Sequence, residues 1–471
     1  MNLISLQFFG FVGLVLVVYY LLPRRAQNYW LLAMSYGFYL TWSWQFPLIL
    51  AGMTGWTFFL AQKLQADQSR RRVWLYLGIG GNLGVLLLFK YADFFVPQMA
   101  SLISRLGMNV KGIQILLPIG MSFYILQAIS YLLDVSRKQI PAATHIGDFA
   151  LYLAYFPKLT AGPIERARTF LPQLAQHRVV DNEALARSFT LITIGLVRKI
   201  VVADMLLKAI PSKIFVTPEQ FSALELFIWL ATYFFGLYHD FAGYTNLMRG
   251  VSGLFGIELS RNFAHPLFAR NFTEFWSRWH ITLSQWLRDY IYFPLSRVLV
   301  RRNLSRFNLA DLILPPVATM LVSGLWHGNQ GHILLWGLLM GIYLVGERLP
   351  SLWLPVTSPS TRPRWRQGGG MVIVFLLILG SLPLVLTNIS TAINFWQRLL
   401  HWNTLAWPNV RILLVLVPGI WLDWVQYRNK NELIFLTWPR TVQASLLALA
   451  ALAVLLFSRV GPGEPFIYQG F

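Results

Sequence analysis

Long apolar stretches recur along almost the whole chain, and they constrain the fold more than any other feature of the sequence. A stretch of about 20 apolar residues is long enough to cross a membrane as a helix, and shorter ones are re-entrant or tilted. The pattern predicts an all-α, polytopic membrane protein with about 11 transmembrane helices plus re-entrant and interfacial helices. The stretches lie at about 3–22, 30–42, 46–62, 73–95, 113–135, 146–162, 187–210, 222–239, 312–326, 332–349, 370–387, 410–427 and 441–457.

Composition and charge agree with this class. Of the 471 residues, 56% are hydrophobic and 12% are charged, whereas about a quarter of the residues in soluble domains are charged. The 39 basic residues outnumber the 19 acidic ones and form short clusters between apolar stretches, such as Arg24-Arg25, Arg70 to Arg72 and Arg301-Arg302. Cytoplasmic loops and anionic headgroups favour this distribution. Membrane lipid is therefore the expected partner, and nucleic acid is not.

The first apolar stretch is a membrane span rather than a signal peptide. Residues 3–22 have neither a basic segment before them nor a small-residue cleavage site. Because Arg24-Arg25 follows directly, we expect the N-terminus outside and this loop inside the cytoplasmic membrane.

One segment near the C-terminus resembles a linker. Residues 351–370 are rich in Pro, Ser, Arg and Gly. They separate a motif-rich body, 1–350, from residues 371–471, which resemble peripheral transmembrane helices. No internal repeat of the kind found in many transporters is visible.

The sequence lacks the residues or motifs that several kinds of catalytic and metal-binding chemistry need. The chain has no cysteine, which excludes disulfides, thiolate zinc sites and a cysteine acyl-enzyme. It contains no P-loop and no Gly-x-Ser-x-Gly nucleophile elbow. The spacing of His and Asp matches no recognisable set of metal ligands, so no metal site is predicted.

The stretch 240–303 is too polar to face lipid and too aromatic for a solvent loop. Asn271 and Glu274 form a capping-box pattern that predicts the start of a helix. Aromatic and aliphatic residues then follow at spacings of three and four, from Phe272 to Tyr290. We expect one helix that lies along the membrane interface or dips into the protein.

Two histidines are candidates for chemistry. His327 ends an apolar stretch, and an ionisable group at membrane depth is a functional candidate by default. The alternative is a neutral histidine bonded to a backbone carbonyl. His280 lies in the middle of the expected aromatic helix, where an interfacial histidine also occurs without a function. Of the others, His145, His177 and His401 lie among polar residues, and His265 precedes a proline.

Five stretches resemble blocks of the membrane-bound O-acyltransferase family. The string FTEFWSRWHITLSQWLRDYIYFPL at 272–295 resembles its central motif, and SGLWHG at 323–328 its second histidine motif. The stretches at 117–135, 155–164 and 238–250 are similar to other family patterns. The resemblance covers roughly residues 1–350 and is strongest to the bacterial subgroup that acts in polysaccharide O-acetylation, such as alginate acetylation.

The resemblance implies an activity and an architecture. It implies that His327 is the catalytic histidine and His280 a second functional one, beside a central tunnel open to both membrane faces. An acyl group, most simply acetyl, would pass from a cytoplasmic thioester such as acetyl-CoA to a hydroxyl of an envelope polysaccharide or exopolysaccharide. It also implies an externally facing acyltransferase as partner and no bound cofactor. One departure is Asn246, where the family often has an acidic residue.

A histidine general base fits this reaction. Histidine titrates near neutral pH, and burial disfavours its charged form. The residues expected to contact substrate are Trp276, Trp279, Ser323, Trp326 and Asp289. Ser323 could instead bond back to its own helix, and Asp289 could pair with Arg288.

Other functions remain open at this level. A transporter or flippase for an acyl group or a lipid-linked sugar also uses buried polar groups and broken helices. A D-alanyl transferase acting on teichoic acid is a close cousin of the acetyltransferases. A non-enzymatic scaffold would tolerate replacement of both histidines.

Overall fold

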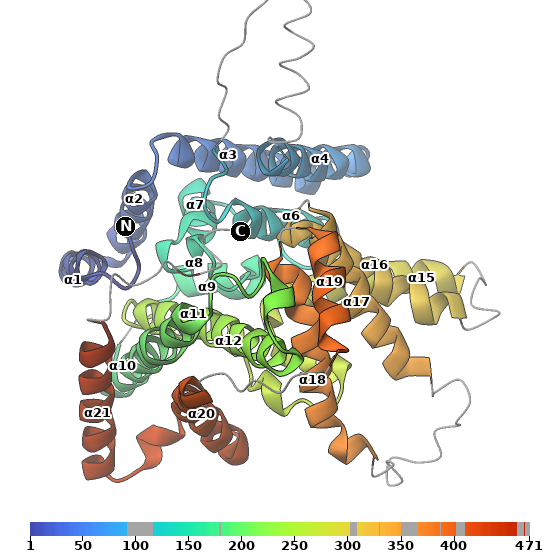
Figure 1. Cartoon of the computed structure of the whole chain (residues 1–471). Helices are drawn as coiled ribbons and strands as arrows, with labels where there is room; N and C mark the ends of the chain where they lie inside the picture. The colour runs from blue at the N-terminus through green and yellow to red at the C-terminus, as the bar shows by residue number, and fades with distance from the viewer. Residues whose placement is uncertain are drawn as a thin grey trace, which may run out of the picture. The chain divides into compact units, whose positions relative to one another are not determined.

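The computed structural model describes residues 1–91, 116–178, 180–301, 309–328, 330–349, 365–386, 388–401, 410–458 and 466. Every regular element among these residues is a helix (Figure 1). The predicted all-α class is therefore confirmed.

The chain forms two compact units. Among the described residues, the first lies within 1–188 and 248–260, and the second within 189–247 and 261–466. The helices of the first unit are α1 (Leu6–Leu21), α2 (Arg24–Leu40), α3 (Gln45–Ala66), α4 (Arg71–Lys90), α6 (Met121–Ser136), α7 (Ile146–Ala154), α8 (Phe156–Leu159) and α9 (Ala167–Ala175). Residues of both units contribute to α10 (Asn182–Leu196) and α12 (Ala223–Gly253).

The second unit contains the motif-rich segments. Its helices are a π-helix (Val197–Ala203), α11 (Asp204–Ala209), α13 (Phe272–Arg278), α14 (Ile281–Leu287), a π-helical turn (Arg288–Tyr292), α15 (Phe293–Arg301), α16 (Leu309–His327), α17 (Gly331–Arg348), α18 (Trp365–Val385), α19 (Ile389–Leu399), α20 (Leu416–Asn429) and α21 (Arg440–Ser458). Short 3₁₀ turns lie at Pro218–Gln220, Pro266–Phe268, Val410–Val415 and Ile434–Thr437.

Three of the described helices are long and apolar enough to cross a membrane, namely α4, α16 and α21. Two further helices, Leu6–Leu21 and Gly370–Val385, are also apolar but shorter. No residue of α21 is buried within the protein, as expected for a helix that contacts lipid. The predicted number of about 11 spans stays a prediction.

In the first unit, α3 and α4 lie side by side against α6 (Figure 1). The start of α6 depends on Gly120, whose φ of 79° is in the left-handed region. A Cβ at this position would lie 2.0 Å from the carbonyl oxygen of Leu159. Only glycine fits this close approach of two backbone segments.

In the second unit, α16 and α17 form a tightly packed hairpin (Figure 1). A Cβ on Gly337 would lie 2.5 Å from the carbonyl oxygen of Met320 and 3.4 Å from the Cα of Gly324. Gly337 and Gly341 repeat the small-xxx-small pattern that lets membrane helices approach closely. The hairpin fixes the end of α16, where His327 lies.

The aromatic segment is not one helix, and this part of the prediction was wrong. The helix does begin where predicted, because the Asn271 side chain accepts a hydrogen bond from the Glu274 amide at 2.7 Å. It ends after Arg278, and a second short helix begins at Ile281. The amide of Ala264 donates to the carbonyl of Arg278 at 2.9 Å, and the amide of Ile281 donates to the carbonyl of Asn262 at 2.9 Å. These bonds satisfy the backbone groups that the break exposes.

The predicted linker lies mostly outside the described residues. Residues 351–364 are among those that the structure does not describe, and residues 365–370 already belong to α18. The division into a body, 1–350, and peripheral helices, 371–471, stays a prediction.

Candidate functional site

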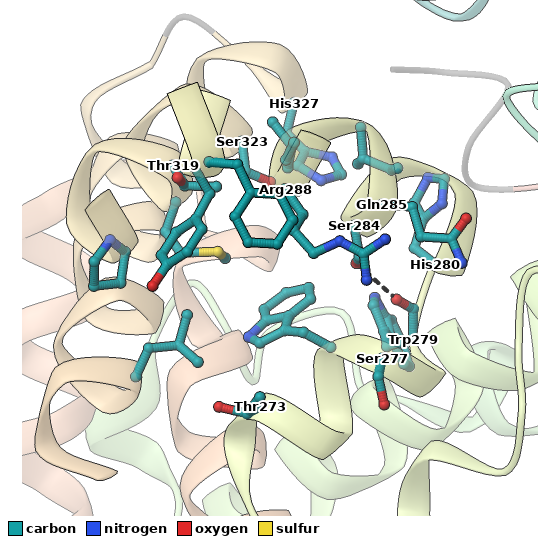
Figure 2. A pocket seen from close by; sticks show the side chains of 18 of the residues that line it. Thr273, Ser277, Trp279, His280, Ser284, Gln285, Arg288, Thr319, Ser323 and His327 are labelled. Carbon is teal, nitrogen blue, oxygen red and sulfur yellow. Dashed lines mark hydrogen bonds between the residues drawn. The ribbon is translucent and has the colours of Figure 1, made fainter. Parts of the chain in front are cut away.

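A cavity of about 250 Å³ lies in the second unit, and both candidate histidines line it (Figure 2). Its walls come from α13, α14, the π-helical turn, α15 and the α16–α17 hairpin. The lining residues are Thr273, Trp276, Ser277, Trp279, His280, Leu283, Ser284, Gln285, Leu287, Arg288, Tyr292, Phe293, Pro316, Thr319, Met320, Ser323, His327, Leu344 and Arg348. The structure thus brings together two motifs that are far apart in the sequence.

His327 is buried at the C-terminal end of α16. Its imidazole lies edge-to-face against two indoles, with ring centroids 4.7 Å from Trp326 and 5.1 Å from Trp336. Such edge-to-face contacts restrict the orientation of the imidazole ring. A histidine held in this way is oriented toward the cavity that it lines.

His280 occupies the break between α13 and α14 and is only 1% exposed. Its backbone is left-handed, with φ at 40°. The ring packs against Phe241 at a centroid distance of 4.8 Å and against Trp326 at 5.9 Å. The Trp326 indole therefore contacts the rings of both histidines.

The strain at His280 is held by its surroundings. A non-glycine residue in the left-handed region costs about 1–2 kcal/mol, and such strain persists only where the environment over-determines it. The hydroxyl of Ser284 donates to the carbonyl of Trp279 at 3.0 Å (Figure 2). The amide of Ser284 donates to the carbonyl of His280 at 2.9 Å. Both bonds hold α14 directly behind the break.

The predicted substrate contacts fall into two groups. Trp276, Trp279 and Ser323 line the cavity with the histidines. Trp326 and Asp289 are absent from the lining, although Trp326 contacts both imidazoles. The carboxylate of Asp289 accepts a hydrogen bond from Arg288 Nε at 3.2 Å, which is the pairing left open by the sequence.

Two arginines at the cavity were missed as candidates. Arg288 and Arg348 both line it, and Arg348 donates to the Tyr292 hydroxyl at 2.9 Å. The signal was present for Arg288, because a basic residue inside an aromatic, membrane-associated segment requires an explanation. Their reach into a shared cavity depends on the packing of the π-helical turn, which carries Arg288, and of α17, which carries Arg348; the sequence does not show this packing.

A buried ionic cluster was also missed. The Asp423 carboxylate on α20 pairs with Arg198 and accepts a hydrogen bond from Tyr238 at 2.7 Å. His265 was not a candidate for chemistry in the sequence, but its ring is buried and lies 3.3 Å from the same carboxylate. Nearby in the chain, Lys199 pairs with Asp204 and Asp240, also buried. These groups join α20 to α12 and the π-helix.

The sequence predicts no metal site. No group of three or more His, Cys, Asp or Glu side chains placed to hold a metal ion occurs among the described residues. That no metal takes part stays a prediction.

The cavity combines the groups that acyl transfer requires. It places two imidazoles, a hydroxyl from Ser323 and indoles from Trp276 and Trp279 around one cavity. Imidazoles move protons near neutral pH, and a serine hydroxyl can donate or accept a hydrogen bond.

Comparisons with known proteins point to the same chemistry. The model of the membrane-bound O-acyltransferase family matches residues 38–388. A probable alginate O-acetylase of Azotobacter vinelandii is 36% identical over 377 residues, which cover 79% of this chain and 72% of the relative. A peptidoglycan O-acetyltransferase of Helicobacter pylori is 31% identical over 373 residues, covering 72% and 69%. A teichoic acid D-alanyltransferase of Streptococcus thermophilus is 28% identical over 285 residues, covering 59% and 68%.

Proposed function

Because this chain belongs to the membrane-bound O-acyltransferase family, and so is a multi-pass membrane enzyme that transfers acyl groups, we propose that it acetylates a polysaccharide of the cell envelope. The donor is a thioester on the cytoplasmic side, and the acceptor is a sugar hydroxyl. The single observation that carries this proposal is the cavity shared by His327 and His280. The names of the alginate and peptidoglycan relatives support acetyl as the group transferred.

His327 is the general base of the proposed reaction. It takes the proton of the attacking hydroxyl while the oxygen forms the new ester bond to the acyl carbon. The carbon–sulfur bond then breaks, and the thiolate leaves as a thiol with the proton from the imidazolium. General-base assistance of this kind contributes about a hundred- to ten-thousandfold in rate. The burial of His327 between two indoles supports its role, since it presents an oriented imidazole to the cavity.

Arg288 and Arg348 suit a donor that carries phosphate. Both line the cavity, and a guanidinium binds phosphate oxygens through paired hydrogen bonds. Coenzyme A and phosphopantetheine both link a thioester to phosphate. An acetyl-CoA-like donor therefore fits the charge of this wall.

The remaining parts of the proposal concern the cell. The enzyme lies in the cytoplasmic membrane with its N-terminus outside, and a tunnel connects its cavity to both membrane faces. An externally facing acyltransferase receives the acyl group or completes its delivery to the polysaccharide. The basic pair Arg24-Arg25, at the start of α2 and directly after the first apolar helix, supports this orientation, because basic residues favour the cytoplasmic side.

D-alanine is the competing acyl group. The relative from Streptococcus thermophilus is named for the transfer of D-alanine to teichoic acid, at lower identity than the acetyltransferases. Family membership decides against the transporter and scaffold alternatives, but the donor's acyl group is decided only by its product.

Mass spectrometry of envelope polysaccharide tests the proposal. Strains with and without the gene are compared, and the deletion strain is complemented with the wild-type gene. We expect acetyl esters to disappear on deletion and to return on complementation. Unchanged acetyl esters, or loss of D-alanyl esters instead, would refute acetylation.

A further inference from the structure

The geometry points to Asn262 as a positioning residue that fixes the tautomer of His280, with the ring proton on Nδ1 and the lone pair on Nε2. This inference rests on the proposed function, because it assigns His280 a role in the same cavity. Asn262 is 1% exposed and lies outside the cavity lining.

The orientation of the Asn262 amide follows from its neighbours. Its Oδ1 accepts from the Thr282 amide at 3.1 Å and from the Thr282 hydroxyl at 2.9 Å. A backbone amide only donates, so the atom facing it must be the oxygen. A flipped side chain would place its NH₂ group against the Thr282 N–H. The structure therefore allows only one assignment of oxygen and nitrogen.

The tautomer of His280 follows from that orientation. Nδ1 of His280 lies 3.3 Å from Asn262 Oδ1. Because this oxygen is an acceptor, Nδ1 must carry the proton to make the bond. A neutral imidazole has one ring proton, so the lone pair is on Nε2. Burial at 1% exposure disfavours the doubly protonated ring.

Asn262 holds both sides of the break as well as the ring. Its carbonyl accepts from the Ile281 amide at 2.9 Å, directly after His280. Two residues further on, the Ala264 amide donates to the Arg278 carbonyl at 2.9 Å. Backbone and side chain of the same short segment thus set the left-handed conformation and the ring proton together.

This tautomer narrows the chemistry of His280. Neutral His280 cannot donate from Nε2, so it is not the donor that stabilises the oxyanion. With its lone pair on Nε2, neutral His280 can accept a proton, so the role that this tautomer leaves to it is that of an acceptor or a base.

The first test reads the tautomer directly and does not depend on activity. The full chain, labelled with ¹⁵N-histidine, is placed in lipid nanodiscs, and His280→Gln identifies the signals of His280. We expect a protonated Nδ1 and an unprotonated Nε2 in the wild type, and a mixture of tautomers in Asn262→Leu. A protonated Nε2 in the wild type would overturn the inference.

The second test measures acetyl esters on the polysaccharide in cells. Asn262→Leu should lower them by about 10- to 100-fold, the effect of removing the outer hydrogen-bond partner that orients a metal-binding histidine. Asn262→Asp keeps an acceptor oxygen and should stay within a few-fold of the wild type. If the leucine variant is fully active, or if the aspartate variant fails equally, Asn262 does not act through the ring.

A matched control separates positioning from loss of a buried amide. Asn82 is also fully buried and donates to Thr57 at 3.2 Å and to the Gly78 carbonyl at 2.8 Å, in the first unit. In Asn82→Leu, acetylation per amount of folded protein should equal that of the wild type. If the deletion strain retains its acetyl esters, the proposed function is refuted. The measurement of the His280 tautomer does not depend on that outcome.

Discussion

At the scale of single residues, Trp326 couples the two candidate histidines. Its indole lies 4.7 Å from the ring of His327 and 5.9 Å from that of His280, measured between centroids. Neither imidazole can shift far without displacing this shared neighbour, because a packed interior transmits such movements. The separation of the two candidate rings therefore depends on a residue that is itself absent from the cavity lining.

Arg348 offers a test of donor binding. Arg348→Gln removes the guanidinium from the cavity and should raise the KM for the thioester donor about 10- to 100-fold, because a hydrogen bond to a charged group contributes about 1.5–3 kcal/mol. Purified enzyme with varied donor concentration measures this. Arg297, exposed on α15 and absent from the lining, is the control, and Arg297→Gln should leave the KM unchanged. Equal KM values for all three proteins would contradict donor binding by Arg348.

The sequence identified both histidines but not their support. Each lies in a recognisable string, so each was a candidate alone. Asn262 was missed because its role depends on a bond to a ring that is 18 residues away in the sequence. Asp289 was equally ambiguous, since pairing with Arg288 or with a histidine requires the same residue types.

At the scale of elements, the site depends on one tight hairpin and one broken helix. The α16–α17 hairpin carries His327 at its end, and the α13–α14 break carries His280. Both elements depend on two backbone segments that lie close together. In the hairpin, Gly337 lets α17 pack closely against α16. At the break, residues 262–264 form backbone hydrogen bonds with Arg278 and Ile281.

Gly337 gives a prediction for the hairpin. In Gly337→Ala the new Cβ would lie 2.5 Å from the Met320 carbonyl oxygen, so α16 must move away from α17. Overpacking of this kind costs about 1–3 kcal/mol, and we expect lower thermal stability together with less acetylation. Gly346 on the same helix has no atom within 4 Å of an added Cβ, so Gly346→Ala should resemble the wild type. Equal melting temperatures for the two variants would contradict the close contact.

Helix prediction succeeded where the apolar pattern alone decided the element. The stretch at 332–349 is α17, Gly331–Arg348, almost to the residue. The aromatic helix was wrong because spacing of three and four continues through Trp279 and His280, while backbone bonds to residues 262–264 end the helix there. A pattern of side chains cannot reveal a backbone partner that comes from another segment.

At the scale of the whole molecule, the chain is an all-helical, multi-pass membrane protein with a strong excess of basic residues, 39 against 19 acidic ones. Composition and apolar periodicity were sufficient to predict the class. The number of spans and a passage through the protein depend on how helices tilt and pack, which composition does not determine. Both stay predictions.

The orientation of the chain is testable because it has no cysteine to remove. Asn2→Cys should react with a membrane-impermeant maleimide in right-side-out vesicles, since the N-terminus is predicted outside. Arg25→Cys, exposed at the start of α2, should react only after the vesicles are permeabilised. The reverse pattern would invert the predicted topology.

The most direct measurement of the central claim is thioester consumption by purified enzyme in lipid, with the acceptor polysaccharide present. His327→Ala should lose acyl transfer by about a hundred- to ten-thousandfold while remaining folded and inserted, because it lacks the general base. His177→Ala, a change at an exposed loop histidine, should retain full activity. Full transfer by His327→Ala would contradict the role of this residue as the base.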